Sequence, residues 1–380
     1  MRIAHFLFGR CNPDSANGID KSVYYLSHAQ AELRHEVAVF SLTGKPPLPI
    51  PEVTVKVSQP TGHPFTLPKD LFTQLCEWQP DIVHIHSVYT PQNVRVAYSL
   101  RSLGIPYVVT PHGGLSPHVL KRHWYLKFPY KVCCELPCLN RAAFVHAIAD
   151  VEDISHYGVR APIVAAPNGI DLGLIPKNVE QQLLVSRFPQ TRGKFVFLFL
   201  GRVDPFHKGL DLLFEGFSLT RPKNSVIVVV GPDREGRRGM LENLADHLGI
   251  QEQVVFTGPM YGAEKFDCMA GADVFVHTSR WEAGVPFSVL EAAAVAKPCL
   301  VTHSADPGGQ LTRYVGGMTV QPEAKSIAAG LQRFSELPAR ELEAMGQHAR
   351  DMVEREFSWT TSAQVLIEAY STYATRAVHT

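Results

Sequence analysis

The stretch that decides the fold runs from Thr278 to Ala292 and reads TSRWEAGVPFSVLEA. An apolar run, Val274–His277, comes directly before it, and the residues at its end are rich in alanine. This pattern predicts a buried strand, a loop that contains Gly284, and then a helix. The first turn of such a helix leaves backbone N–H groups without partners, which makes an anion site that needs no charged side chain.

Two carboxylates, Glu282 in the loop and Glu291 in the helix, flank this anion site. Carboxylates do not bind phosphate, but they accept hydrogen bonds from hydroxyl groups. Each glutamate alone is typical of a solvated surface position. Together on one strand–loop–helix turn, they indicate a ligand with both phosphate and hydroxyl groups, of which a sugar nucleotide is the common example.

The same alternation of apolar strand and amphipathic helix runs along the chain, which is typical of parallel, doubly wound sheets. The strands that we expect are Ile3–Phe8, Glu36–Leu42, Ile82–Ser87, Tyr107–Pro111, Phe144–Ala149, Ile163–Ala166, Phe195–Leu200, Ser225–Val230, Val254–Thr257, Val274–His277 and Cys299–His303. The helices that we expect between them include Lys21–Leu33, Pro68–Trp78, Asn93–Leu103, Val119–Arg141, Lys208–Leu219, Gly239–Leu248, Ala263–Ala270 and Phe287–Ala296, and the chain from Ala324 on is expected to be helical.

With 380 residues, the chain exceeds the ~250–300 residues at which a single core stops growing. We therefore predict an α/β protein with two Rossmann-like domains that face each other across a cleft. The strand–helix rhythm stops near residue 167 and restarts near 194, which places the boundaries. The predicted parts are an N-terminal domain over 1–170, a linker over 171–193, a C-terminal domain over 194–356 and a helical tail over 357–380.

The composition, with 45% hydrophobic and 19% charged residues, is that of an ordinary globular protein. The net charge is zero, so the chain lacks the basic face that a nucleic-acid partner needs. No apolar run is long enough to span a bilayer, and the N-terminus lacks the long apolar region of a signal peptide. Seven scattered cysteines form no disulfide framework and fit a reducing compartment. We expect a cytoplasmic protein.

A second group of candidate residues follows the apolar strand Phe195–Leu200. Gly201 ends that strand, Arg202 comes next, and Lys208 opens the following helix. Both cations are therefore expected at the carboxyl end of the sheet, where Arg offers a planar fork and Lys a compact charge for phosphate oxygens. Solvated loop cations are the plainer interpretation. The strand–loop–helix junction favours a site that neutralises a departing diphosphate without a metal.

Weaker signals lie in the first half of the chain. His112 is followed by two glycines after a strand and can bond a sugar hydroxyl or carry a proton, although a lone loop histidine is more often solvated. His84 and His86 alternate on a strand, where packed, hydrogen-bonded histidines are the favoured interpretation, His86 being nearer the cleft. Gly18 lets a loop approach one phosphate, but the G-x-G-x-x-G fingerprint of a dinucleotide site is absent.

The segment Lys121–Lys131 interleaves basic and aromatic residues, with Lys121, Arg122 and Trp124 at its start. This pattern suits an anionic membrane interface or an anionic acceptor. A helix with packed aromatic and solvated basic residues explains it equally well, because Pro129 interrupts any long amphipathic face. Both interpretations stay open.

Several motifs are absent. No Asp-x-Asp occurs in the chain, so a carboxylate-held Mg²⁺ or Mn²⁺ on a sugar diphosphate is not predicted. The P-loop, G-x-S-x-G and zinc motifs are missing as well. We expect no cofactor and no metal, with a nucleoside diphosphate sugar as co-substrate.

Taken in order, the motifs resemble those of the retaining glycosyltransferases of the GT-B fold. More narrowly, they resemble glycosyltransferase family four, the large family that includes sucrose synthases and bacterial mannosyl- and glucosyltransferases. The resemblance covers nearly the whole chain, and in that family the last helix crosses back onto the N-terminal domain. The residues that carry it are Pro111-His112-Gly113, Pro167-Asn168-Gly169-Ile170-Asp171, Gly201-Arg202 with Lys208-Gly209, the pair Glu282 and Glu291, and Phe357-Ser358-Trp359.

The resemblance implies roles residue by residue. Arg202 and Lys208 would grip the donor diphosphate, and Glu291 would bond the ribose hydroxyls. Glu282 would contact the hydroxyls of the transferred sugar, and His112 its primary hydroxyl. Further donor contacts would come from Gly18, Gly201, Gly258, Met260, Gly284, Val285, Phe287 and Ser288. Apart from the resemblance, the position of His86 near the cleft and the basic and aromatic pattern of Lys121–Lys131 make His86, Lys121, Arg122 and Trp124 the candidate acceptor contacts.

Two positions depart from the family pattern. The family usually spaces its glutamates as E-x7-E, whereas 291 − 282 = 9 here, one residue more. Either a bulge absorbs the extra residue, or Glu282 is displaced and its sugar contact is in doubt. The first loop has Asn17 before Gly18 where many relatives have two glycines, which puts the contact with the β-phosphate in question.

The expected function is transfer of a sugar from a UDP- or GDP-sugar to a hydroxyl acceptor with retention of configuration, in polysaccharide, glycolipid or glycoside biosynthesis. A lipid-linked acceptor would bring the protein to the inner membrane face through Lys121–Lys131. A sugar-nucleotide epimerase on the same fold is one alternative, and it would change the donor without any acceptor. A catalytically silent protein that binds sugar nucleotides or glycans is the other.

Overall fold

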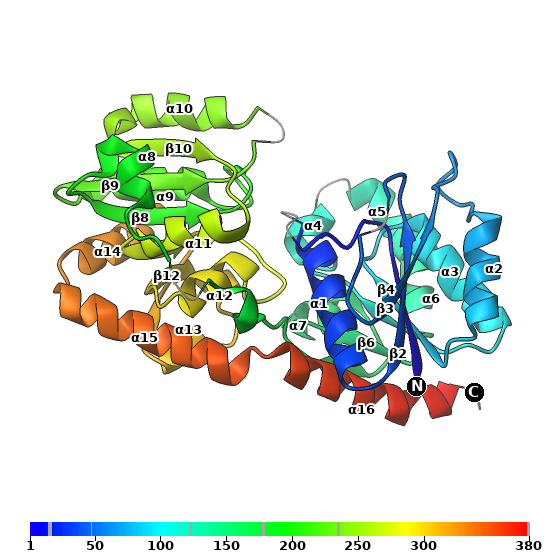
Figure 1. Ribbon diagram of the computed structural model, residues 1–380. Coiled ribbons are helices and arrows are strands. Elements are labelled where there is room, and N and C mark those ends of the chain that lie inside the picture. Colours follow the sequence, from blue (N-terminus) through cyan, green and yellow to red (C-terminus); the bar gives the residue numbers. More distant parts are fainter. Residues whose placement is uncertain are drawn as a thin grey trace. The chain divides into compact units, whose positions relative to one another are not determined.

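A computed structural model of the chain describes residues 1–13, 17–46, 48–121, 124–149, 151–176, 179–233 and 236–377 (Figure 1). The chain divides into two compact units. The first consists of Met1–Gly169 together with Trp359–Thr380, and the second is Ile170–Ser358.

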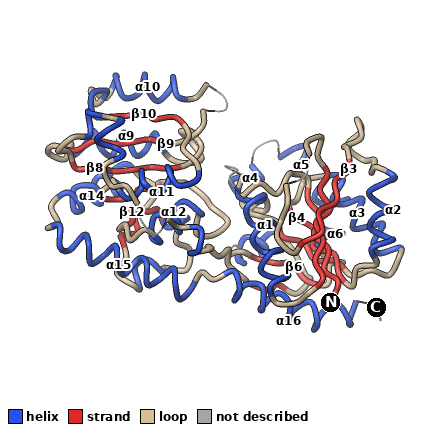
Figure 2. The backbone as a smooth tube through the Cα atoms, viewed as in Figure 1, coloured by secondary structure: helices blue, strands red, loops and turns tan. Residues whose placement is uncertain are grey.

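The first unit is built on a seven-stranded sheet in which the paired strands are parallel (Figure 2). The strand order is β3-β2-β1-β4-β5-β6-β7. The central strands are almost wholly buried, as expected of a parallel sheet that is covered on both faces. The strands are β1 (Arg2–Leu7), β2 (Glu36–Leu42), β3 (Val53–Ser58), β4 (Ile82–His86), β5 (Tyr107–Thr110), β6 (Phe144–Ala147) and β7 (Ile163–Ala165).

Alternate residues of each strand point to opposite faces of this sheet. On one face, apolar strand residues such as Phe6 and Ile85 pack with α2, α3, α6 and α7. The other face is covered by α1 and α16, which lie side by side (Figure 1). Gln30 of α1 and Tyr370 of α16 form hydrogen bonds with histidines of the strands. The helices of this unit are α1 (Gly18–Glu32), α2 (Lys69–Trp78), α3 (Pro91–Ser102), α4 (Pro117–Lys121), α5 (Trp124–Tyr130), the π-helix η1 (Lys131–Glu135), α6 (Leu136–Leu139), α7 (Val151–Tyr157) and α16 (Trp359–Ala377).

The second unit repeats this design with a six-stranded parallel sheet, in the order β10-β9-β8-β11-β12-β13. One core lies between this sheet and α9, α10 and α14, and the other between the sheet and α8, α11, α12 and α15. The strands are β8 (Phe195–Leu200), β9 (Ser225–Val230), β10 (Val254–Gly258), β11 (Val274–His277), β12 (Cys299–Thr302) and β13 (Gly317–Val320). The helices are η2 (Leu172–Leu174), α8 (Leu183–Arg187), η3 (Pro189–Thr191), α9 (Leu210–Thr220), α10 (Arg238–His247), η4 (Gln251–Gln253), α11 (Gly262–Ala270), α12 (Phe287–Ala294), η5 (His303–Ala305), α13 (Gln310–Arg313), α14 (Ala324–Ser335) and α15 (Ala339–Glu356).

The predicted fold class, two doubly wound parallel sheets, is confirmed. Where the sequence predicts a linker over 171–193, the structure has short helical segments, and Leu184 is fully buried in a core of the second unit. The last helix, α16, groups with the first unit. Two edge strands, β3 and β13, were not predicted, and the helix predicted over Val119–Arg141 is divided among α4, α5, η1 and α6.

No helix among the described residues is both long and apolar enough to cross a bilayer.

Candidate active site

Two neighbouring strands define the switch point of the second sheet. β8 pairs with β11, and the strand order runs outward from β8 to β9 and β10, and from β11 to β12 and β13. In a parallel sheet with this order, the loops after the two central strands diverge and leave room for a ligand at the carboxyl edge. These loops are residues 201–209 and 278–286, which contain most of the predicted catalytic residues.

Hydrogen bonds to backbone carbonyl groups connect the two loops. The Oγ1 of Thr278 lies 2.9 Å from the carbonyl oxygen of Gly209, and the N–H of Arg280 donates to the carbonyl of His207 at 3.0 Å. Gly209 has a φ of +63°, and a Cβ at this position would lie 2.0 Å from the Thr278 carbonyl oxygen. Only glycine therefore allows the two loops to approach so closely.

Lys208 and Glu282 form an ion pair across the two loops, with Nζ 2.5 Å from Oε1. His277, the last residue of β11, donates from Nε2 to the same Oε1 at 3.1 Å. The His277 ring is buried and stacks on Phe199. One oxygen of Glu282 thus accepts hydrogen bonds from a cation on one loop and from the end of the strand that precedes the other.

Electrostatics keep Glu282 ionised. Burial opposes its ionisation, but the charge of Lys208 and the hydrogen bond from His277 outweigh burial and hold the pKa of Glu282 well below its usual range. Burial lowers the pKa of His277 against the opposing hydrogen bond to Glu282, so the ring is neutral at pH 7. Because an ammonium group has three N–H donors, Lys208 keeps two after bonding Glu282.

Within the part of the chain that the structure describes, Arg202 is the one cation of these loops without a carboxylate at ion-pair distance, since Lys208 pairs with Glu282 and Arg280 with Asp211. The nearby Asp204 is occupied by Arg237, with Nη1 2.9 Å from Oδ1, and by the N–H of His207 at 3.0 Å. Arg202 is partly buried and forms no ion pair with any residue that the structure describes. A partly buried guanidinium of this kind can take an anion that offers two oxygens.

The helix α12 begins at Phe287, behind Pro286, and has no acidic residue in its first turn. The positive end of this helix is therefore not neutralised from within. Glu291 lies in the second turn, is 7% exposed, and pairs with Lys265 of α11 at 2.9 Å between Nζ and Oε1. The two predicted glutamates thus both carry a lysine partner.

The other donor residues predicted in this unit lie at the ends of strands and around the start of α12. Gly258 ends β10 with a φ of +80°, with nothing within 4 Å of where a Cβ would lie. Met260 is buried in the core of the unit. Their contacts with a donor stay predictions, as do those of Gly201, partly exposed after β8, of Gly284 and Val285, both buried, and of Phe287 and Ser288, both partly exposed.

In the first unit, the predicted residues lie at the carboxyl edge of its sheet. The Asn17 side chain caps α1, and Gly18 is the first residue of that helix. His112 follows β5 with a φ of +50°, and its Nε2 lies 3.1 Å from Nδ1 of His86. His86 is buried and also bonds His5 at 3.0 Å, so both of its nitrogens are occupied by other imidazoles. The interpretation of His86 as a packed, hydrogen-bonded histidine agrees with this geometry, and its contact with an acceptor stays a prediction.

The basic and aromatic segment is largely exposed. Lys121 ends α4 and is exposed, and Trp124 begins α5 with 66% of its surface exposed. Arg122 lies outside the described residues. In α5, Tyr125 and Phe128 are also 59% and 62% exposed, whereas Tyr130 is partly buried and packs on Tyr89, so only the last aromatic of this helix is packed as the second interpretation expects.

Comparison with known families assigns both halves of the chain. Residues 16–174 match the family described as Glycosyltransferase Family 4, and residues 185–352 match Glycosyl transferases group 1. The chain belongs to this GT-B glycosyltransferase family.

Its relatives are diverse. The chain is 27% identical over 247 residues to the UDP-Gal:alpha-D-GlcNAc-diphosphoundecaprenol alpha-1,3-galactosyltransferase of Escherichia coli. This match covers 61% of this chain and 60% of the E. coli enzyme. The sucrose-phosphate synthase of Thermosynechococcus elongatus has the same fold, with a TM-score of 0.78 and 18% identity over 98% of both chains. Anabaena HepE in complex with UDP and glucose gives a TM-score of 0.76 at 19% identity, over 98% of this chain and 100% of that one.

Sequence reasoning missed three residues of the candidate site. His277 donates a hydrogen bond to Glu282. His207 stacks on the ring of Trp281, with 4.6 Å between the ring centroids. His277 carried a signal, because it is a polar residue at the carboxyl end of a buried strand. Lys265 carried none, since it is 26 residues from Glu291 in sequence and meets it only in the folded chain.

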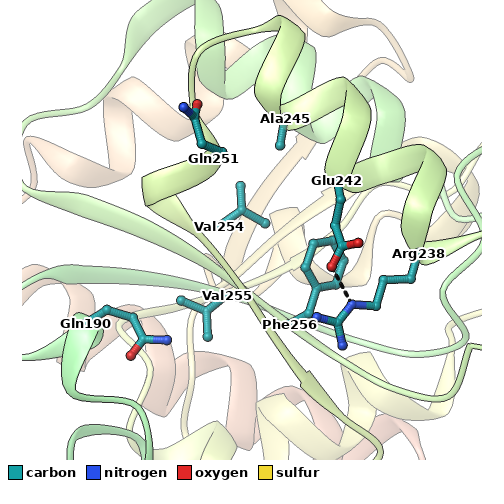
Figure 3. A pocket seen from close by; sticks show the side chains of 8 residues that line it. All are labelled: Gln190, Arg238, Glu242, Ala245, Gln251, Val254, Val255 and Phe256. Atoms are coloured by element: carbon teal, nitrogen blue, oxygen red, sulfur yellow. Dashed lines mark hydrogen bonds and ion pairs between the residues drawn. The ribbon is translucent and has the colours of Figure 1, made fainter.

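A hollow elsewhere in the second unit is not part of this site. It lies beside α10 and β10, and no residue predicted for the glycosyltransferase site lines it (Figure 3). Its charged groups, Arg238 and Glu242, are paired with each other at 2.7 Å. They consequently offer no free charge to a ligand.

Proposed function

We propose that this glycosyltransferase transfers a sugar from a nucleoside diphosphate sugar to a hydroxyl acceptor, with retention of configuration and without a metal ion. The observation that carries the proposal is the charge arrangement at the carboxyl ends of β8 and β11. There, Arg202 has no ion-pair partner among the described residues, and Lys208 uses one of its three ammonium N–H groups for Glu282. The E. coli relative is named as using UDP-Gal, and HepE binds UDP, which supports a UDP-sugar as the first donor to test.

The leaving diphosphate is the group that needs stabilisation. As the bond to the sugar breaks, negative charge develops on the β-phosphate, and preoriented cations stabilise this charge most in the transition state. Arg202 would bind two of its oxygens, Lys208 a third, and the N-terminus of α12 would add a partial positive charge. The diphosphate would itself help to deprotonate the acceptor on the same face, which accounts for retention without an enzymatic nucleophile.

The two glutamates would bind hydroxyl groups of the donor. Glu291 would accept hydrogen bonds from the ribose hydroxyls, while its ion pair with Lys265 holds the carboxylate in position. Glu282 would accept from the transferred sugar through the oxygen that Lys208 and His277 leave open. This leaves Glu282 in a defined position although one extra residue separates it from Glu291.

A charge-removal experiment tests the proposal. Arg202→Ala should lower kcat on the order of 10²-fold, comparable with the loss of one oxyanion donor. The matched control is Arg238→Ala, which removes an arginine of the same unit whose partner is Glu242 in α10. The readout is UDP release from UDP-glucose and UDP-galactose with a panel of glycosidic and lipid-linked acceptors. Equal activity in the two variants would contradict the role of Arg202.

The same assay separates the alternatives. A transferase releases nucleoside diphosphate only in step with product formed on the acceptor. An epimerase would convert the donor without acceptor. Stable binding of the nucleotide sugar by calorimetry with no turnover on any acceptor would favour a binding protein.

We also propose that α5 contacts an anionic lipid surface, where a lipid-linked acceptor would reside. Four large apolar side chains of this short helix are exposed: Trp124, Tyr125, Leu126 and Phe128. The exposed Lys121 precedes them, so apolar insertion and attraction to acidic head groups would act together. Replacing Trp124 and Phe128 by Ser should abolish cosedimentation with vesicles that contain phosphatidylglycerol. Binding that is unchanged, or equal on neutral vesicles, would contradict this proposal.

A further inference from the structure

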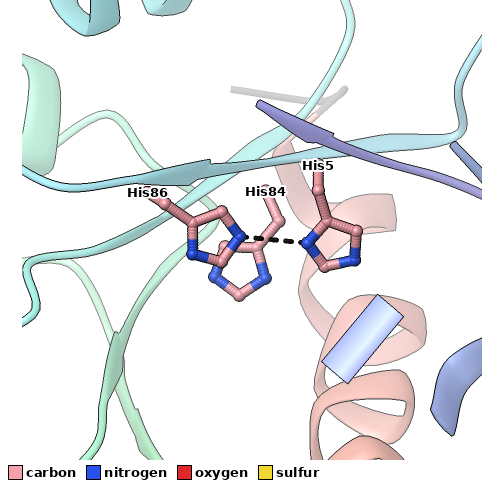
Figure 4. A group of neighbouring side chains, drawn as sticks. All are labelled: His5, His84 and His86. Carbon is pink, nitrogen blue, oxygen red and sulfur yellow. Dashed lines mark hydrogen bonds between the residues drawn. The ribbon is translucent and has the colours of Figure 1, made fainter. Parts of the chain in front are cut away.

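The face of the first sheet that α1 and α16 cover carries four buried histidines, each at most 5% exposed. They are His5 of β1, His84 and His86 of β4, and His146 of β6. Figure 4 shows the rings of the first three gathered beneath the strands. Burial of so many imidazoles is costly unless their nitrogens have hydrogen-bond partners, and here these partners form a continuous network.

One end of the network is His112, at the carboxyl edge of the sheet. Its Nε2 lies 3.1 Å from Nδ1 of His86, and Nε2 of His86 lies 3.0 Å from Nδ1 of His5. Nε2 of His5 lies 2.7 Å from Oε1 of Gln30 on α1. The amide nitrogen of Gln30 in turn lies 3.3 Å from the hydroxyl of Tyr370 on α16.

From Tyr370, the network continues to a backbone carbonyl. The Tyr370 hydroxyl lies 2.6 Å from Nδ1 of His84, whose Nε2 lies 2.5 Å from Oγ1 of Thr110. Thr110 lies 2.8 Å from Nδ1 of His146, and Nε2 of His146 lies 2.8 Å from the carbonyl oxygen of Ala166. The contacts form one unbranched chain from His112 to Ala166.

The five rings are neutral at pH 7. Burial lowers the pKa of His5 and His146 to about 4 and that of His112 to about 3. Burial, and then the neighbouring histidines, lower the pKa of His84 and His86 well below the usual value. Each neutral ring has one N–H donor and one acceptor nitrogen, and the partner of one nitrogen fixes the role of the other.

The Ala166 carbonyl sets the direction of every hydrogen bond. Because a carbonyl only accepts, His146 carries its hydrogen on Nε2, and its Nδ1 accepts from Thr110. Thr110 therefore accepts from Nε2 of His84, and Nδ1 of His84 accepts from Tyr370. By the same rule, each of the groups from Tyr370 back to His112 donates once toward Ala166.

The reversed direction is excluded by one contact. It would leave the unprotonated Nε2 of His146 facing the Ala166 oxygen at 2.8 Å, two acceptors without a hydrogen between them. In the favoured direction, His112 is protonated on Nε2, and its Nδ1 is an acceptor. Among the described residues, no group contacts this Nδ1.

We propose that this buried chain fixes the tautomer of His112, so that the ring presents Nδ1 as a hydrogen-bond acceptor to a hydroxyl of a bound sugar. Gln30 and Tyr370 are then positioning residues, since they act on the ligand only through the histidines. This inference rests on the proposed function for its ligand, but the tautomer itself is a property of the free protein.

A metal site is the competing explanation for the cluster. His5, His84 and His86 each offer a nitrogen, and these atoms lie within 4.8 Å of one another. In the chain described above, however, both nitrogens of each ring already have partners. A metal would therefore break the chain, which makes the two explanations distinguishable.

The experiment reads the tautomers directly, by long-range ¹H–¹⁵N correlation spectra of the ¹⁵N-histidine-labelled full chain at pH 7 without ligand. Assignment uses His112→Gln. Tyr370→Phe removes one oxygen and keeps the ring that stacks on Phe144, which uncouples His112 from the Ala166 carbonyl. The matched control is Tyr373→Phe, on the same helix, whose ring also packs on Phe144.

The expected result is a single Nε2–H tautomer of His112 in the unmodified protein and in Tyr373→Phe, and a mixture of tautomers in Tyr370→Phe. Sugar transfer by Tyr370→Phe should then fall about twofold to tenfold in kcat/KM, in proportion to the competent tautomer. An Nδ1–H tautomer, an unchanged His112 signal in Tyr370→Phe, or ligation shifts of the three histidines on adding Zn²⁺ would overturn the proposal. Expected spectra in a chain that transfers no sugar would instead contradict the proposed function alone.

Discussion

Among the described residues, the ammonium group of Lys208 pairs with Glu282, and both side chains are mostly buried, at 13% and 14% exposed. We expect Lys208→Ala to lower kcat by about 10²-fold or more, because the β-phosphate loses a cation that acts most strongly in the transition state. The measurement is single-turnover product formation at saturating donor. Unchanged turnover would remove Lys208 from the mechanism.

Stability must be separated from catalysis in this variant. Truncating one partner of a buried ion pair leaves the other charge uncompensated and can cost roughly 3–5 kcal/mol. The double variant Lys208→Ala with Glu282→Gln removes the uncompensated charge. It should regain thermal stability relative to Lys208→Ala but not activity.

At this scale, the sequence indicated the charged residues of the site better than their partners. Arg202, Lys208, Glu282 and Glu291 stand at strand ends or helix starts, where the chain's periodicity predicts the carboxyl edge of a sheet. Partner identity is a property of tertiary packing. Nothing local distinguishes Lys265, which pairs with Glu291, from other lysines on amphipathic helices.

At the scale of elements, the junction between the β8 loop and α9 depends on a glycine. Gly209→Ala should destabilise the second unit by about 2 kcal/mol or more, because it combines a left-handed backbone with a Cβ placed 2.0 Å from the Thr278 carbonyl oxygen. Thermal or urea unfolding measures this loss. The control is Gly193→Ala, which has a φ of +68° but nothing within 4 Å of its Cβ, so it isolates the backbone term. Equal losses in the two variants would show that the loops are not in close contact.

The sequence predicted central elements better than peripheral ones. Five of the six residues of Ser225–Val230 are apolar and the whole strand is buried, so its bounds were predicted as observed. β3 and β13 lie at the edges of their sheets, are only partly buried, and mix polar with apolar residues, so they resemble loops in sequence. The predicted helix over Val119–Arg141 was too long because the π-helix η1 depends on contacts such as buried Glu135 with the N–H of Tyr89.

Glu135 gives that element a pH dependence. Burial raises its pKa to about 7, against the hydrogen bond from Tyr89 that lowers it. Because the folded-state pKa is above the unfolded value, the folded state binds the proton more tightly, and this contribution to stability is lost as the pH rises toward 7. Glu135→Gln should flatten the loss of stability between pH 5 and pH 7, measured by urea unfolding. The neighbouring exposed Glu152→Gln should leave it unchanged.

At the scale of the whole molecule, the two sheets repeat one strand order, yet their switch points carry different chemistry. In the second unit, the loops after β8 and β11 gather cations and carboxylates. In the first, neutral histidines occupy β1 and β4. The doubly wound class of both sheets was predictable from the alternation of strands and helices, but the edge strands β3 and β13 were not. The histidine chain was not, since it needs Tyr370 of α16 to meet His84 across 286 residues of sequence.

The neutral histidines should make the whole protein sensitive to acid. Burial lowers their pKa values below the unfolded value of 6.5, to about 4 for His5 and His146. Below pH 6.5 the unfolded chain therefore binds protons that the folded chain excludes, so stability is full above 6.5 and falls as the pH drops toward 4. In this window, each histidine lowers the free energy of unfolding by about 1.4 kcal/mol per pH unit as the pH falls. Glu135, whose pKa is raised, acts in the opposite direction.

We expect the free energy of unfolding, measured in urea, to fall steeply from pH 6.5 to pH 4.5. In His146→Asn, the slope of this free energy against pH should decrease by the amount that corresponds to about one proton taken up on unfolding. His63→Gln, at an exposed loop position of the same unit, is the control and should leave the slope as it is. The slope, unlike the absolute stability, is insensitive to packing lost by the substitution, because it counts protons taken up on unfolding. If His146→Asn and His63→Gln share the slope of the unmodified chain, the buried rings are not held neutral, and the fixed direction of the histidine chain fails with them.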